Sequence, residues 1–333
     1  MRALWLTGTL AVTLGTLLLL AEHGRSLLEP VSTAPAPQLF EVSAGTSFAS
    51  VARRLEQGGL IRSARMATFV ARYNGMDGQL HVGEYELSPD QSTREVLEAI
   101  TTGQVKTWRV TVPEGSRAED IALRLEASGL VSADTFRSAL RNTQLANELG
   151  VPSRDFEGYL FPDTYQLPRG LEAEQMVRLL VGQFETVWQK QIQPLSEDSR
   201  LSKHEIVTLA SIVEKETASP AERPLIAAVF LNRLKLGMRL ETDPAVIYGI
   251  PEFDGNLRRR HLNDVKNLYN TYQHTGLPPG PIASPGQEAL QSVVEPEETD
   301  YLYFVSKNDG THQFSKTYAE HQKAVNRFQR SRR

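Results

Sequence analysis

The stretch FEVSAGTSFASVARRLEQGGLI, residues Phe40–Ile61, has a similar second copy later in this chain. It returns as WRVTVPEGSRAEDIALRLEASGLV, residues Trp108–Val131, with Gly45 aligned to Gly115 at an offset of 70 residues. Each copy begins with alternating apolar residues, which predict a short strand, then turns at a glycine. It continues with apolar residues at helical spacing and stops at a further glycine. We therefore expect two small strand-helix modules, although a duplicated structural element without a ligand would show the same pattern.

The segment between the two copies completes this region. HVGEYELSP (His81–Pro89) predicts a strand, and STREVLEAITTG (Ser92–Gly103) predicts a helix. Ser92 and Glu95 form the pattern of a capping box at the start of that helix, and Gly103 is a typical residue just beyond its end.

The sequence changes character from about Asp155, where aromatic and proline-rich turns begin. A second domain is expected from here. Its predicted helices are AEQMVRLLVGQFETVWQKQI, HEIVTLASIVEKETA and ERPLIAAVFLNRLKLG. YLYFVSKNDGTHQFS predicts a hairpin turned at Asp309-Gly310, and a last helix runs toward Phe328. The predicted fold class is mixed α+β, because strands and helices do not alternate as they do in a parallel α/β sheet.

Composition excludes several classes of protein. The chain has 333 residues, 40% of them hydrophobic, which is enough for two cores. A net charge of -4 gives no reason to expect a nucleic-acid partner. Without cysteine there is no disulfide, thiol nucleophile or cysteine-based metal site.

The N-terminal region predicts a membrane anchor. Ala3–Ala21 contains no charged residue, and its length just suffices to cross a hydrocarbon core of about 30 Å. A cleaved signal peptide is the alternative, but its apolar core is usually shorter and Ala21-Glu22-His23 is a poor cleavage site. The charges flanking the segment place the bulk of the chain outside the cytoplasm. Glu29–Gln38, with three prolines, predicts an extended linker.

TLASIVEKETA, residues Thr208–Ala218, ends an apolar helix with two glutamates. On a helical projection Glu216 falls beside the apolar face that contains Leu209 and Val213, whereas Glu214 points away from it. A carboxyl at the edge of an apolar face has a raised pKa and can remain protonated near neutrality, as a general acid must. Glu216 is therefore the candidate catalytic residue. A solvated helix end is the alternative interpretation of both glutamates.

No other motif offers competing chemistry. The sequence contains no HExxH, GxSxG or GxxxxGK[ST] pattern, and its seven histidines lack metal-ligand spacing, so no metal site is predicted. Aromatic and neutral polar side chains on both sides of the glutamate suit a carbohydrate better than a phosphate. The substrate-binding candidates, chosen by position, are Asn232, Thr242, Asn270 and Tyr272, with Tyr248 as a stacking residue.

Several long motifs occur in a recognisable order. They are EGYLFPDTY, LASIVEKETA, ERPLIAAVFLNRLKLGMRLETDPAVIYG, YNTYQHTGLPPGPIASPG and YLYFVSKNDGTHQFSKTYAEH. Together they resemble the endolytic murein transglycosylase family of bacterial inner-membrane proteins. The resemblance implies one membrane span, a LysM-like glycan-binding subdomain and a catalytic domain outside the cytoplasm. It also places the catalytic glutamate, the second of the EKET motif, at Glu216. The implied domains are an anchor (1–21), a linker (22–38), the duplicated region with its LysM-like module (39–150) and the catalytic domain (151–333).

The family resemblance also implies a reaction and partners. Enzymes of this family cleave the MurNAc-GlcNAc bond inside nascent peptidoglycan strands, leave 1,6-anhydroMurNAc ends and terminate strand elongation, without a metal or cofactor. The implied partners are glycan strands, the membrane and cell-wall synthases. Two alternatives stay open: a hydrolytic muramidase that uses Glu216 with a second carboxylate such as Asp243, and a non-catalytic peptidoglycan-binding scaffold.

Overall fold

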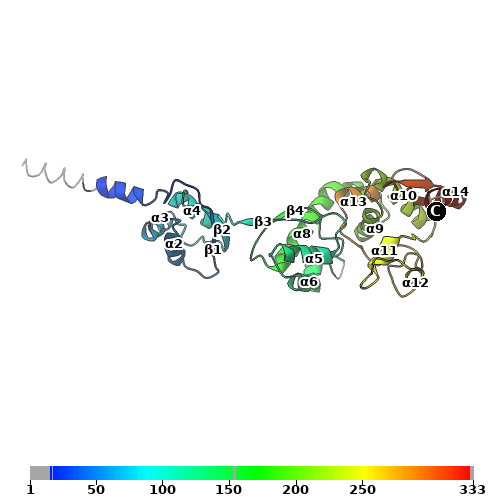
Figure 1. The fold of residues 1–333 in the computed structure, drawn as a ribbon, viewed down its shortest axis with the longest axis horizontal. Helices are drawn as coiled ribbons and strands as arrows, with labels where there is room; N and C mark the ends of the chain where they lie inside the picture. The colour runs from blue at the N-terminus through cyan, green and yellow to red at the C-terminus, as the bar shows by residue number, and fades with distance from the viewer. Residues whose placement is uncertain (1–15, 17, 153–154, 331–333) are drawn as a thin grey trace, which may run out of the picture. The chain divides into compact units, whose positions relative to one another are not determined.

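The computed structural model describes residues 16, 18–152 and 155–330. It is a mixed α+β structure, as predicted, with two-stranded sheets β1-β2, β3-β4 and β5-β6 among its described residues (Figure 1). The chain forms two compact units. The first unit comprises residues 1–108 and 166–170, and the second comprises residues 109–165 and 171–333.

The first unit is built around the first copy of the repeat. Its elements are β1 (Gln38–Val42), α2 (Phe48–Gln57), α3 (Ala64–Tyr73), β2 (Gly83–Leu87) and α4 (Thr93–Thr101). β1 and β2 are antiparallel, with Gln38 opposite Leu87 and Val42 opposite Gly83. The predicted capping box of Ser92 and Glu95 is present at the start of α4. The apolar faces of these elements enclose one core, with Leu55, Tyr85 and Ile100 among its fully buried side chains.

The predicted turn and cap glycines have the backbone conformations that the repeat requires. Gly45, Gly59, Gly115 and Gly129 all have positive φ angles, between 66° and 75°. A side chain would strain the backbone there, so glycine is the residue that allows each strand to turn into its helix and each helix to stop. The predicted order of strand, turn and helix is confirmed in both copies.

The expected linker is bound to the first unit. The Leu28 carbonyl accepts a hydrogen bond from the Thr93 amide at 3.0 Å, and Arg62 donates to the Pro30 carbonyl at 2.6 Å. The Ser32 amide donates to the Pro89 carbonyl at 2.9 Å. This differs from a free spacer, because carbonyl groups of a proline-containing segment still accept hydrogen bonds.

The second copy of the repeat belongs to the second unit. Gly115 donates to the Ser284 carbonyl at 2.9 Å, and the Ser284 amide donates to the Ser116 carbonyl at 2.8 Å. Lys215 donates to the Gly115 carbonyl at 3.1 Å. Because these contacts join the second copy to the rest of the second unit, the boundary between the two compact units lies near Trp108. The sequence predicts the boundary between the duplicated region and the catalytic domain at residue 150.

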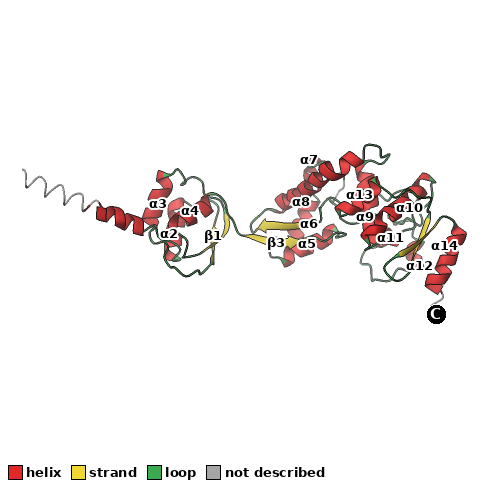
Figure 2. Ribbon diagram, turned by 90° about the horizontal axis from the view of Figure 1, so that it is seen from above, coloured by secondary structure: helices red, strands yellow, loops and turns green. Residues whose placement is uncertain are grey.

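The second unit is largely helical (Figure 2). The repeat and the segment after it form β3 (Thr107–Thr111, which begins in the first unit), α5 (Ala118–Ala127), α6 (Ala133–Leu140), α7 (Thr143–Glu148), β4 (Thr164–Pro168, which ends in the first unit) and α8 (Ala173–Val187). The rest forms α9 (Lys203–Glu216), α10 (Arg223–Lys235), α11 (Asp243–Tyr248), α12 (Arg259–Leu262), α13 (Gln287–Val294), β5 (Tyr303–Ser306), β6 (His312–Ser315) and α14 (Tyr318–Val325). The predicted hairpin is confirmed, since β5 and β6 are antiparallel and Gly310 in their turn has a φ of 87°.

Helix α9 is the central helix of this unit. It packs against α10, α11 and α13, and every residue from Ile206 to Val213 is buried. A helix that is apolar on all sides belongs in a core. Its last residue, Glu216, therefore emerges from the interior of the second unit.

The predicted membrane span cannot be followed along its length. Residues 3–15 and 17 of the segment Ala3–Ala21 lie outside the described residues, and residues 18–26 are helical. Within the part of the chain that is described, no helix has both the length and the apolar character needed to cross a bilayer.

Candidate active site

Glu216 lies in a pocket of about 360 Å³. It is the last residue of α9, and Thr217 after it has extended backbone, so the helix ends at the pocket. The pocket is lined by Glu216, Arg233, Leu240, Glu241, Asp243, Tyr272, Phe304 and His321. These residues come from α9, α10, α11, β5, α14 and the loops beside them, so the pocket exists only when the whole unit is folded.

The Glu216 carboxyl is enclosed but reaches the pocket. The residue is partly exposed, and the Thr242 hydroxyl donates a hydrogen bond to its Oε1. The pKa of Glu216 is raised to about 7, mainly by burial and also by the nearby Asp243 carboxylate. The Thr242 hydrogen bond and the positive charge of Arg233 act in the opposite direction. Glu216 can therefore hold a proton near neutral pH and also release it, as a general acid and base must.

Asp243 and Tyr272 form a second polar pair in the same pocket. The Tyr272 hydroxyl donates to Asp243 Oδ1 at 2.8 Å. This bond leaves the other carboxylate oxygen of Asp243 available, and it fixes the tyrosine ring on the pocket wall. Asp243 is the first residue of α11, and Thr242 is its N-cap. One short helix start thus supplies two of the groups that surround Glu216.

Arg233 holds the wall of the pocket together. Its Nε donates to the Leu302 carbonyl at 2.7 Å, and its Nη1 donates to the Leu240 carbonyl at 2.8 Å. The same Nη1 lies 3.4 Å from a carboxylate oxygen of Glu241. The guanidinium therefore joins α10 to two loops, and its charge favours the ionised form of Glu216.

The Glu214 carboxyl is buried and bound by other residues of the protein. Its side chain is 5% exposed and forms an ion pair of 2.9 Å with Arg223, which also binds Glu114 at 3.1 Å and Glu288 at 2.8 Å. The amide of Gly286 donates to Glu214 at 3.0 Å. Burial raises the pKa of Glu214, and the Gly286 hydrogen bond and Arg223 oppose that rise. Glu214 is thus not a solvated helix end, because distant residues cover it.

Two of the sequence-selected binding residues, Thr242 and Tyr272, lie with Glu216, and three lie elsewhere. Asn232 donates to the carbonyls of Thr299 and Tyr301 at 2.8 and 3.1 Å. The fully buried Asn270 donates to three backbone carbonyls, those of His261, Leu262 and Asp264. Tyr248 donates to Glu157 at 3.3 Å, the Arg117 guanidinium lies over its ring, and the tilted ring of Tyr269 contacts it. None of these three is among the residues that line the pocket.

Sequence reasoning missed five pocket residues: Arg233, Leu240, Glu241, Phe304 and His321. Phe304 and His321 belong to the C-terminal hairpin and helix, about 90 and 105 positions after Glu216. His321 stacks on Tyr303 with ring centroids 5.2 Å apart, and its buried Nδ1 has no hydrogen-bond partner within the described structure. Burial and Arg233 lower the pKa of His321, against the opposing effect of Glu241, and so favour the neutral imidazole. The motif YLYFVSKNDGTHQFSKTYAEH was visible in the sequence, but nothing in it indicates that β5 packs on α10 and brings Phe304 to the Glu216 pocket.

A second buried carboxyl, Glu157, was also missed. It belongs to EGYLFPDTY and accepts a hydrogen bond from the Ala118 amide at 3.1 Å, at the start of α5. Burial raises the pKa of Glu157 to about 8. Its carboxyl lies outside the Glu216 pocket. Among the described residues, no group of three His, Asp or Glu side chains has an arrangement that could hold a metal ion.

The fold and the site together define a class of protein. It is an α+β protein in which the end of a buried helix carries a glutamate of raised pKa, in a pocket with two further carboxyl groups. The chain belongs to the YceG-like family, whose model matches residues 40–327. This confirms the resemblance found in the sequence.

Named relatives agree with this assignment. The chain is 30% identical to an endolytic murein transglycosylase of Bacillus subtilis, over 92% of this chain and 89% of the relative. It is 26% identical to an endolytic murein transglycosylase of Streptococcus pneumoniae, over 84% of this chain but 56% of that longer relative. A crystal structure of a yceG-like protein from Listeria monocytogenes is also similar. The match has a TM-score of 0.61 and 30% sequence identity, and it covers 87% of this chain and 100% of the Listeria chain.

Proposed function

We propose that the protein is an endolytic murein transglycosylase, a lyase that cleaves the MurNAc-GlcNAc bond within nascent peptidoglycan strands and so terminates their elongation. The observation that carries the proposal is the Glu216 carboxyl, enclosed in a pocket with a pKa of about 7. Family membership and the names of the relatives support the substrate class. A buried group poised at neutral pH is the feature expected of a general acid.

The reaction needs one acid-base group. Protonated Glu216 gives its proton to the glycosidic oxygen, the bond from that oxygen to the muramyl anomeric carbon breaks, and the GlcNAc hydroxyl leaves. The muramyl C6 hydroxyl then attacks the same anomeric carbon and gives its proton to ionised Glu216, which restores the acid and leaves a 1,6-anhydro end. Because the nucleophile is part of the substrate, ring closure gains from intramolecular proximity. The pocket's task is to hold the sugar and exclude water.

The other pocket residues have roles that follow from their positions. Positive charge develops on the sugar ring in the transition state, and the carboxylate of Asp243 in the same pocket stabilises it. Tyr272 orients Asp243 through its hydrogen bond. Thr242 fixes the rotamer of Glu216, because its hydroxyl donates to Oε1. The roles of Asn232, Tyr248 and Asn270 in substrate binding stay predictions from the sequence.

A hydrolytic muramidase is the second candidate, because Asp243 lies in the same pocket and could activate a water molecule. Mass spectrometry of digested peptidoglycan distinguishes the possibilities. A transglycosylase produces 1,6-anhydroMurNAc ends, a muramidase produces reducing ends, and a scaffold produces no new ends. Glu216→Gln abolishes the new ends in the first two cases, so a digest by the wild-type chain that contains only reducing ends overturns the proposal.

We also propose that the protein is a single-pass inner-membrane protein with most of its chain outside the cytoplasm. The support for the anchor is the uncharged run Ala3–Ala21. The domains that we propose are the anchor (1–21), the linker (22–38), the duplicated region with its LysM-like module (39–150) and the catalytic domain (151–333). Alkaline carbonate extraction tests the anchor. Recovery of the protein in the soluble fraction, with a mature N-terminus beyond Ala21, means that the segment is a cleaved signal peptide.

We assign weak peptidoglycan binding to the duplicated region, and cell-wall synthases are the protein partners that the family resemblance suggests. A chain that begins at Arg109 retains the whole second unit and removes most of the first. It should keep some cleavage but pellet less with purified sacculi than the full chain. Equal pelleting of the two chains contradicts a binding role for the first unit.

A further inference from the structure

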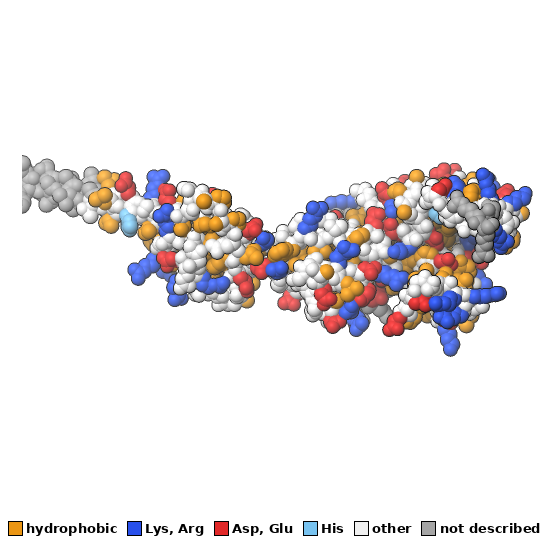
Figure 3. Space-filling model, in the orientation of Figure 1, with side chains coloured by type: hydrophobic (Ala, Val, Ile, Leu, Met, Phe, Trp, Pro, Cys, Tyr) orange, Lys and Arg blue, Asp and Glu red, His pale blue; other side chains and the backbone are white. Residues whose placement is uncertain are grey.

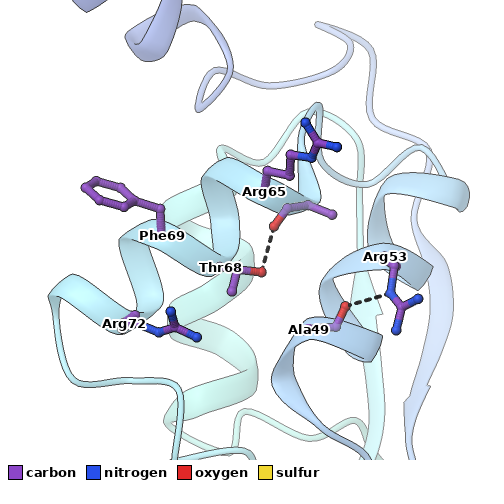
Figure 4. Close-up of a pocket in the computed structure, with 7 residues that line it drawn as sticks. Ala49, Arg53, Arg65, Thr68, Phe69 and Arg72 are labelled. Atoms are coloured by element: carbon purple, nitrogen blue, oxygen red, sulfur yellow. Dashed lines mark hydrogen bonds between the residues drawn. The ribbon is translucent and has the colours of Figure 1, made fainter.

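The first unit carries a basic groove between α2 and α3. Its volume is about 370 Å³. The described residues that line it are Ala49, Arg53, Ala64, Arg65, Thr68, Phe69 and Arg72, and they include no carboxylate. Phe69 projects outward from α3, whereas Thr68 and Arg72 lie on the side that faces α2 (Figure 4). Basic side chains are visible on the surface of the first unit (Figure 3).

Among the residues that the structure describes, the arginines of the groove have no strong partners. Arg72 is 3.9 Å from Asp77, and both side chains are largely exposed, so this pair contributes little. Arg53 donates only to the Ala49 carbonyl of its own helix, at 3.3 Å. The groove therefore offers guanidinium groups to an anionic ligand, and phosphate is an anion that arginine binds in bidentate geometry.

The outward face of α3, next to the groove, exposes two aromatic rings (Figure 4). Phe69 is 65% exposed and Tyr73 is 82% exposed, and their rings stack with centroids 6.3 Å apart. Residues four apart lie on one side of a helix, and Met66 precedes Phe69 by three positions on that side. Exposed aromatic rings interleaved with arginines have the composition of a membrane-interface surface.

This face of α3 lies close to the segment that follows the proposed membrane anchor. Met66 lies close to Gly24, since a Cβ built on Gly24 would meet the Met66 side chain at 3.6 Å. Gly24 follows the last residue of the uncharged run by three positions, or about 4.5 Å of helix. The headgroup layer on each side of a bilayer is about 5–7 Å thick. If Ala3–Ala21 spans the membrane, α3 begins inside that layer, and the hydrogen bonds of residues 28–36 keep the unit there.

We propose that the α2–α3 groove and the exposed face of α3 dock on the membrane, with the groove arginines bound to anionic phospholipid headgroups and Phe69 and Tyr73 inserted at the interface. The proposal rests on the proposed membrane anchor. It gives the first unit a partner other than the glycan strand. Docking would hold this unit against the bilayer, beside the surface where newly made strands leave the membrane.

The absence of cysteine makes a direct test possible, because a single introduced cysteine can be labelled. Tyr73→Cys carries an environment-sensitive dye in the full-length chain, reconstituted in vesicles of equal parts phosphatidylglycerol and phosphatidylcholine or of phosphatidylcholine alone. Leu39→Cys is the matched control. It is 51% exposed on β1, which lies on the opposite side of the first unit from the helix of residues 18–26.

We expect the Tyr73 dye to show a blue-shifted emission and quenching by spin-labelled lipid only in the anionic vesicles, and the Leu39 dye to show neither. Replacing Arg53, Arg65 and Arg72 by Gln should lower the ratio of docked to undocked protein by about fivefold each, or about 100-fold together. The three residues are exposed, so unfolding should stay unchanged.

Each other outcome overturns the proposal. A Tyr73 dye that stays in water, while the protein resists alkaline extraction, refutes docking and leaves the anchor intact. Loss of the protein from the vesicles on alkaline extraction refutes the anchor and docking together. A response to soluble peptidoglycan fragments but not to vesicles assigns the groove to glycan strands.

Discussion

Glu216→Gln should stabilise the protein while it abolishes activity. The Glu216 carboxyl has a pKa of about 7 in the folded protein, against an ordinary value of 4.5. Below pH 4.5 the carboxyl is protonated in both the folded and the unfolded chain, so it has no effect. Between pH 4.5 and 7 the unfolded chain ionises first, and the free energy of unfolding falls as the pH rises. At about 1.4 kcal/mol for each pH unit between the two values, the ionised carboxyl costs up to about 3 kcal/mol at pH 8.

The glutamine removes this cost, because it is nearly isosteric, stays neutral and can still accept the Thr242 hydrogen bond. Thermal and denaturant unfolding, measured for both proteins from pH 4.5 to 8, give the difference directly. The two curves should meet near pH 4.5 and separate in favour of Glu216→Gln as the pH rises. Release of anhydro-ended fragments should fall by about 100- to 10,000-fold or more, because the acid and the base step are both lost.

Glu214→Gln is the matched control for both measurements. Arg223 and the Gly286 amide bind the Glu214 carboxyl, so its replacement by glutamine should give no comparable gain in stability and should leave most of the activity. Equal stability of Glu216→Gln and the wild type at pH 8 would show that Glu216 is not held in a desolvated site. Full activity of Glu216→Gln together with an inactive Glu214→Gln would assign the catalytic role to Glu214 instead.

Three further predictions concern the groups around Glu216. Thr242→Val should raise the pKa of Glu216, because it removes a hydrogen bond to the ionised form, and the alkaline limb of the kcat/KM profile should move to higher pH; an unchanged profile would exclude this contact. His321 lines the pocket and its Nδ1 has no hydrogen-bond partner within the described structure, so we expect that atom to bind substrate; His321→Phe should keep the stacking on Tyr303 and lower kcat/KM about tenfold through loss of that one hydrogen bond, with unfolding as the control for structural damage. Asn270→Ala should lower the free energy of unfolding by about 1–3 kcal/mol, because three backbone carbonyls lose their donor; a stability equal to that of the wild type in urea unfolding would contradict that role.

The sequence by itself determined the local structure. The glycines of the two repeats, the capping box of Ser92 and Glu95, and the Asp309-Gly310 turn each act over a few residues. Local rules of backbone conformation and apolar periodicity therefore predict them. The same reasoning placed Glu216 at the end of a buried helix, which α9 confirms. Its catalytic role rests on the proposal and its tests.

The tertiary structure alone decided which residues meet. His321 and Phe304 reach the Glu216 pocket from the end of the chain, and Arg223 covers Glu214 by joining it to Glu114 and Glu288. The amides of Asn232 and Asn270, chosen from sequence as free polar groups, are bound to backbone carbonyls. Many of these contacts join residues far apart in the chain, such as Asn232 with Thr299 and Glu214 with Gly286, and no local pattern encodes them. For the same reason Glu214 is buried in an ion pair with Arg223, although it belongs to the same EKE triplet as the candidate acid, Glu216.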